Sequence, residues 1–177
     1  CLNRFADAVM TEVEPLAAAL AIDTGRSTFA QFEAIKSVEL IRMWAERAPP
    51  IIDQLSGDGQ SGQVPAVHYQ HRLIPYQVVA VISPWNVPLL LAMIDSLAAW
   101  SAGCSVLLKP SEVTPRFIQP LQRALDTVPE LASVLHIITG GPDTGKAMID
   151  QVDAVCFTGS VTTCLLYTSP SPRDPIG

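Results

Sequence analysis

The sequence has few charged residues, and basic residues are the fewer of the two signs. Charged side chains make up 16% of the 177 residues, and 11 Lys and Arg stand against 17 Asp and Glu, a formal net charge of -6. A chain this acidic lacks the basic surface that nucleic acid binding needs, so we exclude nucleic acid as a partner. Hydrophobic residues reach 49%, which is ample for a buried core and excludes disorder over most of the chain.

Long apolar runs and paired cysteines are also missing. The longest apolar stretch, residues 87–100, contains Pro88 and Asp95 and is shorter than the roughly 20 residues of a membrane-spanning helix. We therefore expect no contact with a membrane. The four cysteines have no CxxC spacing, so the sequence predicts neither a metal site nor a disulfide framework. A reducing compartment fits this cysteine usage, and we expect the protein in the cytoplasm.

Apolar residues at helical spacing predict two helices in residues 4–21, divided at Pro15 because proline is not tolerated inside a helix. Thr11 and Glu14 have the spacing of a capping box for the second helix. Gly25 supplies the left-handed residue that ends it.

A further helix is indicated by apolar residues that recur every three positions from Phe32 to Trp44. We expect Pro49 and Pro50 to end this helix, and Phe32 to be a core or packing residue. Residues 1–55 then form a helical segment that packs on the domain behind it.

The stretch 56–62, SGDGQSG, holds three glycines and no hydrophobic residue, which predicts a flexible connection. Residues 64–69 and 73–76 follow as a short extended pair. Residues 56–76 therefore connect the helical segment to the next domain.

Four continuous apolar runs of the buried-strand kind alternate with helical patterns in the rest of the chain. The strand-like runs are residues 77–82, 104–108, 134–138 and 154–157, and the helical patterns are residues 89–102, 116–128 and 144–151. This alternation predicts an α/β fold, a doubly wound, Rossmann-like parallel sheet over residues 77–163 that follows the helical segment. We expect the sheet to be truncated.

Ligands of such sheets bind beyond the carboxyl ends of the strands, so the residues just after each strand are the candidates for a site. Lys109 and Glu112 place an ammonium and a carboxylate at one rim, where they would suit the hydroxyls of a ribose or form an ordinary surface salt bridge. Thr158-Gly159-Ser160 offers two hydroxyls and a bare backbone where a helix begins, a feature that suits pyrophosphate.

Asn86 is held between Pro84-Trp85 and Pro88, whose restricted backbone limits its own. Its amide is a candidate donor for a developing oxyanion. The alternative is an ordinary helix N-cap, since Asn is favoured before an apolar helix.

Four strand-end motifs follow one another along the chain. They are Ser83-Pro84-Trp85-Asn86, Lys109-Pro110-Ser111-Glu112, Gly141-Pro142-Asp143-Thr144-Gly145 and Phe157-Thr158-Gly159-Ser160. In order and approximate spacing they resemble the successive signatures of the NAD(P)-dependent aldehyde dehydrogenase family, and the turn Asp23-Thr24-Gly25-Arg26 resembles that family too. The resemblance covers about residues 4–163, and the ordered set carries it rather than any single motif.

The resemblance implies oxidation of an aldehyde to a carboxylic acid, with Asn86 as the oxyanion-hole residue. Lys109 and Glu112 would hold the adenosine ribose, and the carboxylate of Glu112 favours NAD over NADP. Gly141 and Gly145 would start the helix beside the adenine. The other implied cofactor-binding residues are Ile82, Ser83, Pro84, Trp85, Ser111, Phe157, Thr158, Gly159 and Ser160. Residues 64–76 would belong to an arm through which the parent protein forms a homo-oligomer.

The chain departs from the family pattern at its end. The nucleophilic cysteine and the general-base glutamate of the family belong to sequence that this chain does not contain, and Cys164 comes only four residues after Ser160. We expect native sequence to end near Thr163, residues 164–177 to be a foreign, disordered Ser/Pro-rich tail, and sequence to be missing before Cys1. The chain alone is then expected to be inactive.

Two alternatives remain open at this point. Residues 140–147, GGPDTGKA, satisfy the GxxxxGK pattern of a nucleotide-binding P-loop, although Ala147 replaces the hydroxyl that would hold magnesium. The other alternative is a remnant that binds or oligomerises without catalysis.

Overall fold

The computed structural model describes residues 1–161, 163 and 164, and it begins with three helices, α1 (Leu2–Thr11), α2 (Val13–Thr24) and α3 (Ser27–Gln54). The first two helices meet at Glu12, and Pro15 is the third residue of α2, where no intrahelical N–H bond is lost. The predicted break at Pro15 is thus displaced. The capping box is wrong, because Thr11 Oγ1 donates to the Ala8 carbonyl at 2.7 Å. Gly25 ends α2 with φ of 70° as predicted.

Helix α3 passes through Pro49 and Pro50 and ends at Gln54, so the predicted stop is wrong. The φ of proline is itself helical, and both prolines are exposed, so they lie on the side of α3 away from the core. Phe32 is not a core residue, because it lies half exposed, but it packs against the ring of Phe29. A spacing of three residues drifts around a helix with 3.6 residues per turn. The face of α3 that is buried comprises Ala30, Glu33, Ala34, Ser37, Val38 and Ile41.

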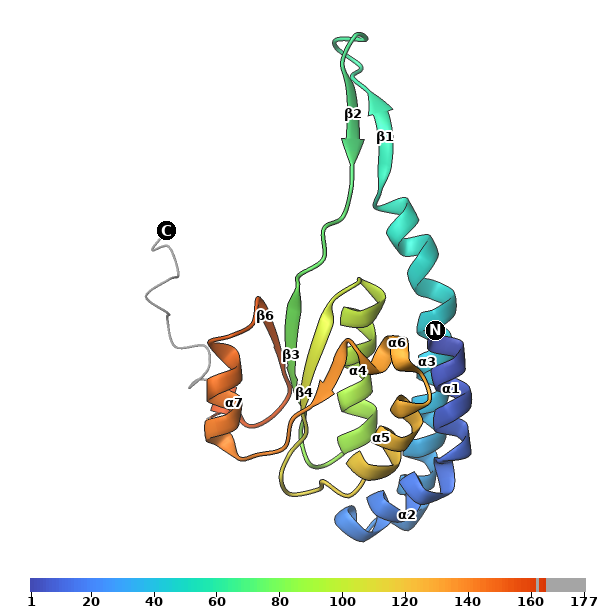
Figure 1. Ribbon diagram of the computed structural model, residues 1–177, viewed down its shortest axis with the longest axis vertical. Coiled ribbons are helices and arrows are strands. Elements are labelled where there is room, and N and C mark those ends of the chain that lie inside the picture. Colours follow the sequence, from blue (N-terminus) through green and yellow to red (C-terminus); the bar gives the residue numbers. More distant parts are fainter. Residues whose placement is uncertain (162, 165–177) are drawn as a thin grey trace.

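An antiparallel hairpin projects from the body at the end of α3 (Figure 1). Strand β1 (Gly57–Gln60) pairs with β2 (His68–His71), and Gly57 faces His71. The glycine-rich stretch is therefore the first strand, not a flexible connection, and the predicted pairing of residues 64–69 with 73–76 is wrong. Gly59 faces Tyr69, and a Cβ at Gly59 would overlap the tyrosine ring, which explains a glycine in this strand.

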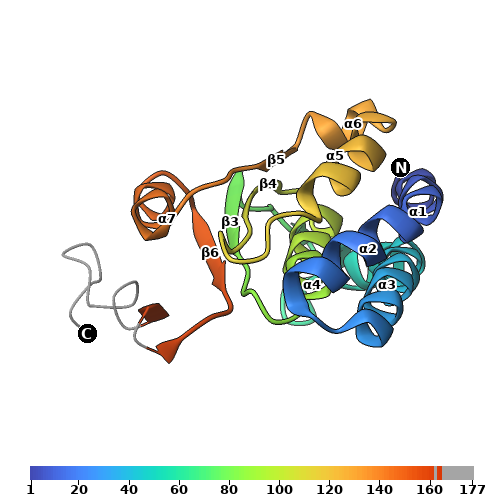
Figure 2. The same cartoon turned by 90° about the horizontal axis from the view of Figure 1, so that it is seen from below.

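The remaining strands form one parallel sheet with the order β5-β4-β3-β6. Its strands are β3 (Val78–Ile82), β4 (Ser105–Lys109), β5 (Leu135–Ile137) and β6 (Ala154–Phe157), and its helices are α4 (Pro88–Ser101), α5 (Ile118–Asp126), α6 (Pro129–Ala132) and α7 (Pro142–Ile149). Figure 2 shows α4 and α5 on one face and α7 on the other. The predicted doubly wound α/β fold is confirmed.

The order of the strands places a topological switch beside β3. The chain moves from β3 to β4 and β5, and then returns to the other side of β3 as β6. In sheets of this kind the crevice at the carboxyl ends of the strands beside the switch binds ligands. The hairpin leads into β3, so this crevice lies at the end of the sheet away from the hairpin (Figure 1).

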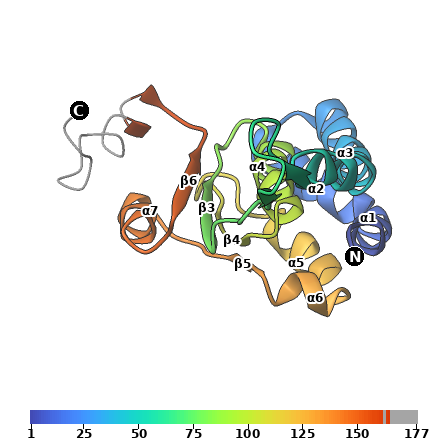
Figure 3. The ribbon, with the colours of Figure 1, turned by 90° about the horizontal axis from the view of Figure 1, so that it is seen from above.

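The helical segment and the sheet share one buried cluster of apolar side chains. Figure 3 shows α1, α2 and α3 beside α4, on the side of the sheet opposite α7. Phe5 of α1 meets Trp100 of α4 edge to face, with ring centroids 6.0 Å apart. Within the described residues, no helix is both long enough and apolar enough to span a membrane.

Candidate functional site

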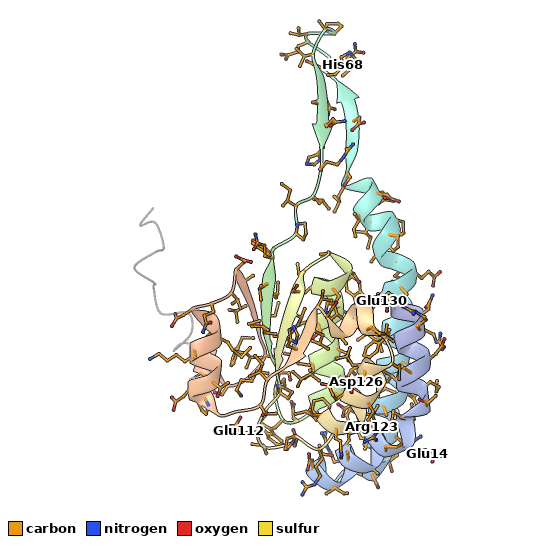
Figure 4. The ribbon with its side chains drawn as sticks, in the orientation of Figure 1. Glu14, His68, Glu112, Arg123, Asp126 and Glu130 are labelled. Atoms are coloured by element: carbon orange, nitrogen blue, oxygen red, sulfur yellow. The ribbon has the colours of Figure 1, made fainter. Side chains whose placement is uncertain are left out.

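A cleft of about 540 Å³ lies at the carboxyl ends of β3, β4 and β6. The register of the strands creates it, because Ile82, at the end of β3, is level with Lys109 of β4 and with Phe157 of β6. The three loops that follow therefore leave the sheet side by side. Figure 4 labels Glu112 at this end of the molecule and His68 at the far hairpin tip.

Most of the residues predicted from the sequence line this one cleft. They are Ile82, Ser83, Pro84, Trp85, Asn86, Lys109, Ser111, Glu112, Phe157, Thr158, Gly159 and Ser160. Sequence reasoning missed Leu91, Val113, Pro142 and Thr163, which line it as well. Three of the four predicted motifs thus converge on one edge of the sheet, and of the fourth only Pro142 reaches the cleft.

Lys109 is a buried cation at the wall of the cleft. Its side chain is 5% exposed, whereas that of Glu112 is 52% exposed, so the two form an ion pair in which one partner is buried rather than a salt bridge on the open surface. The Nζ atom lies 3.4 Å from Glu112 Oε2 and 3.4 Å from the Pro110 carbonyl oxygen. An ammonium has three donors, and both contacts are long, so Lys109 keeps capacity for a ligand hydroxyl.

Ser83 lines the cleft between β3 and β4 and is itself buried. Its backbone N–H donates to the Lys109 carbonyl at 3.1 Å. Its Oγ has no hydrogen-bond partner among the described residues. Buried hydroxyls are nearly always paired, so this atom marks a place where a polar ligand would complete the site.

Asn86 is exposed and lines the cleft one residue before the N-cap of α4, which is Val87. No side chain of the cap residue bonds to α4, so the alternative of an Asn86 N-cap is wrong. The carbonyl oxygen of Asn86 accepts a hydrogen bond from Arg26 Nη2. The neighbouring carbonyl of Trp85 accepts one from Thr114 Oγ1 at 3.2 Å.

The start of α4 is held from another helix by Glu33, which sequence reasoning missed. Glu33 Oε1 accepts hydrogen bonds from the N–H groups of Leu89 at 2.8 Å and Leu90 at 3.1 Å. Burial raises the pKa of this carboxyl, while the two backbone donors and the charge of Arg26 oppose the rise. The available signal was a glutamate between Ala30 and Ala34 on the buried face of α3.

Gly141 and Gly145 are not among the described residues that line the cleft. Gly141 is the N-cap of α7, and Pro142, the next residue, reaches the cleft. Gly145 is buried within α7. The P-loop alternative is also wrong. Helix α7 begins at Pro142 and contains both Gly145 and Lys146, so these residues do not form an open loop that could surround a phosphate.

A helical turn begins at Ser160, as the sequence predicts. The Thr163 N–H donates to Ser160 Oγ at 3.2 Å, and the Cys164 N–H donates to the Ser160 carbonyl at 2.9 Å. Gly159 lies against the ring of Phe157, and an added Cβ would meet that ring at 2.5 Å. The predicted disordered tail falls, apart from Cys164, on residues 165–177, which lie outside the described residues.

Comparisons with known proteins agree with this geometry. The family model described as "Aldehyde dehydrogenase family" matches residues 1–168, and so extends beyond Thr163, where we expected the resemblance to end. N-succinylglutamate 5-semialdehyde dehydrogenase of Sphingopyxis alaskensis is 34% identical over 98% of this chain and 36% of its own length. The 2-aminomuconic semialdehyde dehydrogenase of Mus musculus is 34% identical over 96% of this chain and 35% of its own.

Solved structures show the same fold. The PutA structure from Anabaena variabilis, with 42% identity, superposes with a TM-score of 0.88 over 95% of this chain and 35% of its own. A NAD-dependent aldehyde dehydrogenase from Sinorhizobium meliloti, with 26% identity, gives a TM-score of 0.84 over 95% of this chain and 34% of its own. The chain spans about a third of the length of these relatives. It belongs to the aldehyde dehydrogenase family.

Proposed function

We propose that this chain is the cofactor-binding portion of an enzyme that oxidises an aldehyde to a carboxylic acid with NAD. The observation that carries the proposal is the convergence of the loops after β3, β4 and β6 on one cleft at the switch point of the sheet. Similarity to an enzyme named NAD-dependent and to a betaine aldehyde dehydrogenase of Staphylococcus aureus solved with NAD+, at 26% identity and a TM-score of 0.80 over 95% of this chain and 34% of its own, supports it.

The residues around the cleft fit a dinucleotide. Lys109 is buried with long contacts, and Ser83 Oγ is buried without a partner among the described residues, so both atoms have hydrogen-bonding capacity for a polar ligand. Lys109 and Glu112 would hold ribose hydroxyls as donor and acceptor. The exposed carboxylate of Glu112 would repel a 2'-phosphate, which favours NAD over NADP.

When bound, NAD supplies the acceptor for the hydride that leaves the substrate. The residue of this chain that would take part in the reaction is Asn86, which is exposed and lines the cleft. Its amide would donate a hydrogen bond to the oxygen of the aldehyde as negative charge develops there. The thiolate that attacks the aldehyde and the base that activates water would come from outside these residues.

The experiment is a titration of the purified chain with NAD, followed by calorimetry and by tryptophan fluorescence. Trp85 is 57% exposed in the cleft, so we expect saturable heat together with a change in its emission. The Trp85→Phe variant, as control, should lose most of the emission change. NADP should bind at least about tenfold more weakly because of the charge of Glu112. A folded chain that gives neither heat nor emission change with NAD would overturn the proposal.

A further inference from the structure

The backbone around Asn86 is held by hydrogen bonds from outside its own loop. Helix α4 has no side-chain cap of its own, yet the first N–H groups of a buried helix need partners. Asn86 belongs to neither a helix nor a strand, so its carbonyl also needs a partner from elsewhere. The backbone groups at both ends of this short segment, residues 86–90, find their hydrogen-bond partners in the turn and helix that run from Arg26 to Glu33.

Glu33 forms one of these two attachments. It is 1% exposed on α3, and a single carboxylate oxygen accepts from both Leu89 and Leu90, more than 50 residues away in the sequence. A carboxylate at a helix N-terminus is favoured by the dipole of the helix as well as by the two N–H donors. Burial of Glu33 is thereby offset only while α4 begins at this place.

Arg26 forms the other attachment. Its guanidinium donates to the Asn86 carbonyl and lies 4.8 Å from the ring centroid of Phe29, which restrains its orientation. The same turn is fixed to the body by Asp23, whose buried carboxylate accepts from the backbone N–H of Arg116 at 2.9 Å and from its guanidinium. The guanidinium that donates to the Asn86 carbonyl therefore extends from a turn whose backbone is anchored to the body by Asp23.

We propose that Arg26 and Glu33 are positioning residues for the side-chain amide of Asn86. Arg26 sets the plane of the peptide that follows Asn86, and Glu33 sets where α4 begins, at Pro88, two residues later. Together they fix the backbone on the carboxyl side of Asn86, so that its amide stays directed to the cleft. The inference rests on the proposed role of Asn86 as an oxyanion donor, which requires a preorganised amide.

The test uses the 15N-labelled chain and two matched pairs of variants. Arg26→Met and Glu33→Ala remove the hydrogen bonds, whereas Arg26→Lys keeps a donor and Glu33→Gln keeps an acceptor. Arg42→Met serves as control, because Arg42 lies on α3 in an exposed pair with Asp7. Hydrogen exchange of the Leu89 and Leu90 amides and the NMR signal of the Asn86 side-chain amide are measured, and each sample is then titrated with NAD.

We expect Glu33→Ala to speed exchange at Leu89 and Leu90 at least about tenfold, and Arg26→Met to shift and broaden the Asn86 side-chain amide signal. Glu33→Gln and Arg26→Lys should restore most of each effect, and Arg42→Met should change neither. An Asn86 signal unchanged in Arg26→Met, which alters an exposed residue and should fold, would overturn the positioning role. Absence of NAD binding to the unaltered chain would instead overturn the proposed function, since neither NMR readout depends on the cofactor.

Discussion

Lys109 is a residue whose buried charge favours ligand binding in the cleft but lowers the stability of the fold. Its ammonium is buried beside a single exposed carboxylate at 3.4 Å, and burying a charge with so little compensation disfavours the folded state. We expect Lys109→Met, which keeps the length and apolar stem, to leave stability unchanged or raise it by up to about 1 kcal/mol. NAD binding should weaken by about tenfold to a hundredfold, because a charge-assisted hydrogen bond is lost.

Thermal unfolding and calorimetric titration of the same Lys109→Met sample check both effects. Lys146→Met is the matched control, because Lys146 is exposed on α7 and is not among the residues that line the cleft, and it should change neither quantity. A variant of Lys109 that loses stability while binding NAD normally would show a structural lysine instead.

Most site residues could be predicted at this scale because they stand directly after apolar runs. Ile82, Lys109 and Phe157 end strands whose parallel register brings them level. Glu33 could not be found in this way, because its role depends on α3 crossing the start of α4, and no local pattern encodes that crossing. For the same reason, the sequence could not decide whether Asn86 is an oxyanion donor or the N-cap of a helix.

At the scale of elements, an ion pair connects the junction of α1 and α2 to α5. Arg123 donates to both carboxylate oxygens of Glu12, at 3.1 and 2.6 Å, and this hydrogen bonding lowers the pKa of Glu12. A carboxyl whose pKa is lowered by folding adds stability above its unfolded pKa and loses it as the pH falls through the folded value. Figure 4 shows Arg123 on α5 close to the helical segment.

We therefore expect Arg123→Met to lower the Tm at neutral pH, and the difference from the unaltered chain to shrink and disappear as the pH falls below the ordinary pKa of a glutamate and through the lowered pKa of Glu12 in the folded chain. Thermal unfolding of both proteins from neutral to acid pH measures this difference in Tm. Combining the change with Glu12→Gln should add almost nothing at neutral pH. A difference in Tm that stays constant from neutral to acid pH would contradict the account and assign the loss to packing of the arginine stem.

The strands of the sheet were predictable to within one or two residues, whereas the hairpin was not. Strands β3 and β4 are largely buried, so their sequences are mostly apolar. Strands β1 and β2 are exposed along almost their whole length and carry glycines and polar residues, so no periodicity marks them. The short helix α6 was missed as well, because four residues are too few to show a helical period.

At the scale of the whole molecule, the helical segment contacts the loop that carries Asn86, although none of the described residues that line the cleft belongs to it. Its apolar side chains join those of the sheet in one cluster, and Arg26 and Glu33 reach the segment that contains Asn86 and begins α4. The doubly wound fold followed from the alternation of strands and helices. The packing of the helical segment on this domain was expected from the sequence as well, but the amphipathic face of α3 could not show that α4 is the helix it packs against.

The same placement of groups predicts that the chain alone binds NAD without oxidising aldehydes. Burial raises the pKa of the Cys104 and Cys156 thiols, so both stay protonated at neutral pH, and neither lines the described cleft. With NAD and propanal we expect no NADH above a buffer blank, in a sample whose NAD binding has been confirmed by calorimetry. The Cys164→Ser variant is the control, because Cys164 follows the turn at Ser160 beside the cleft. Turnover that Cys164→Ser abolishes would assign the nucleophile to this chain after all.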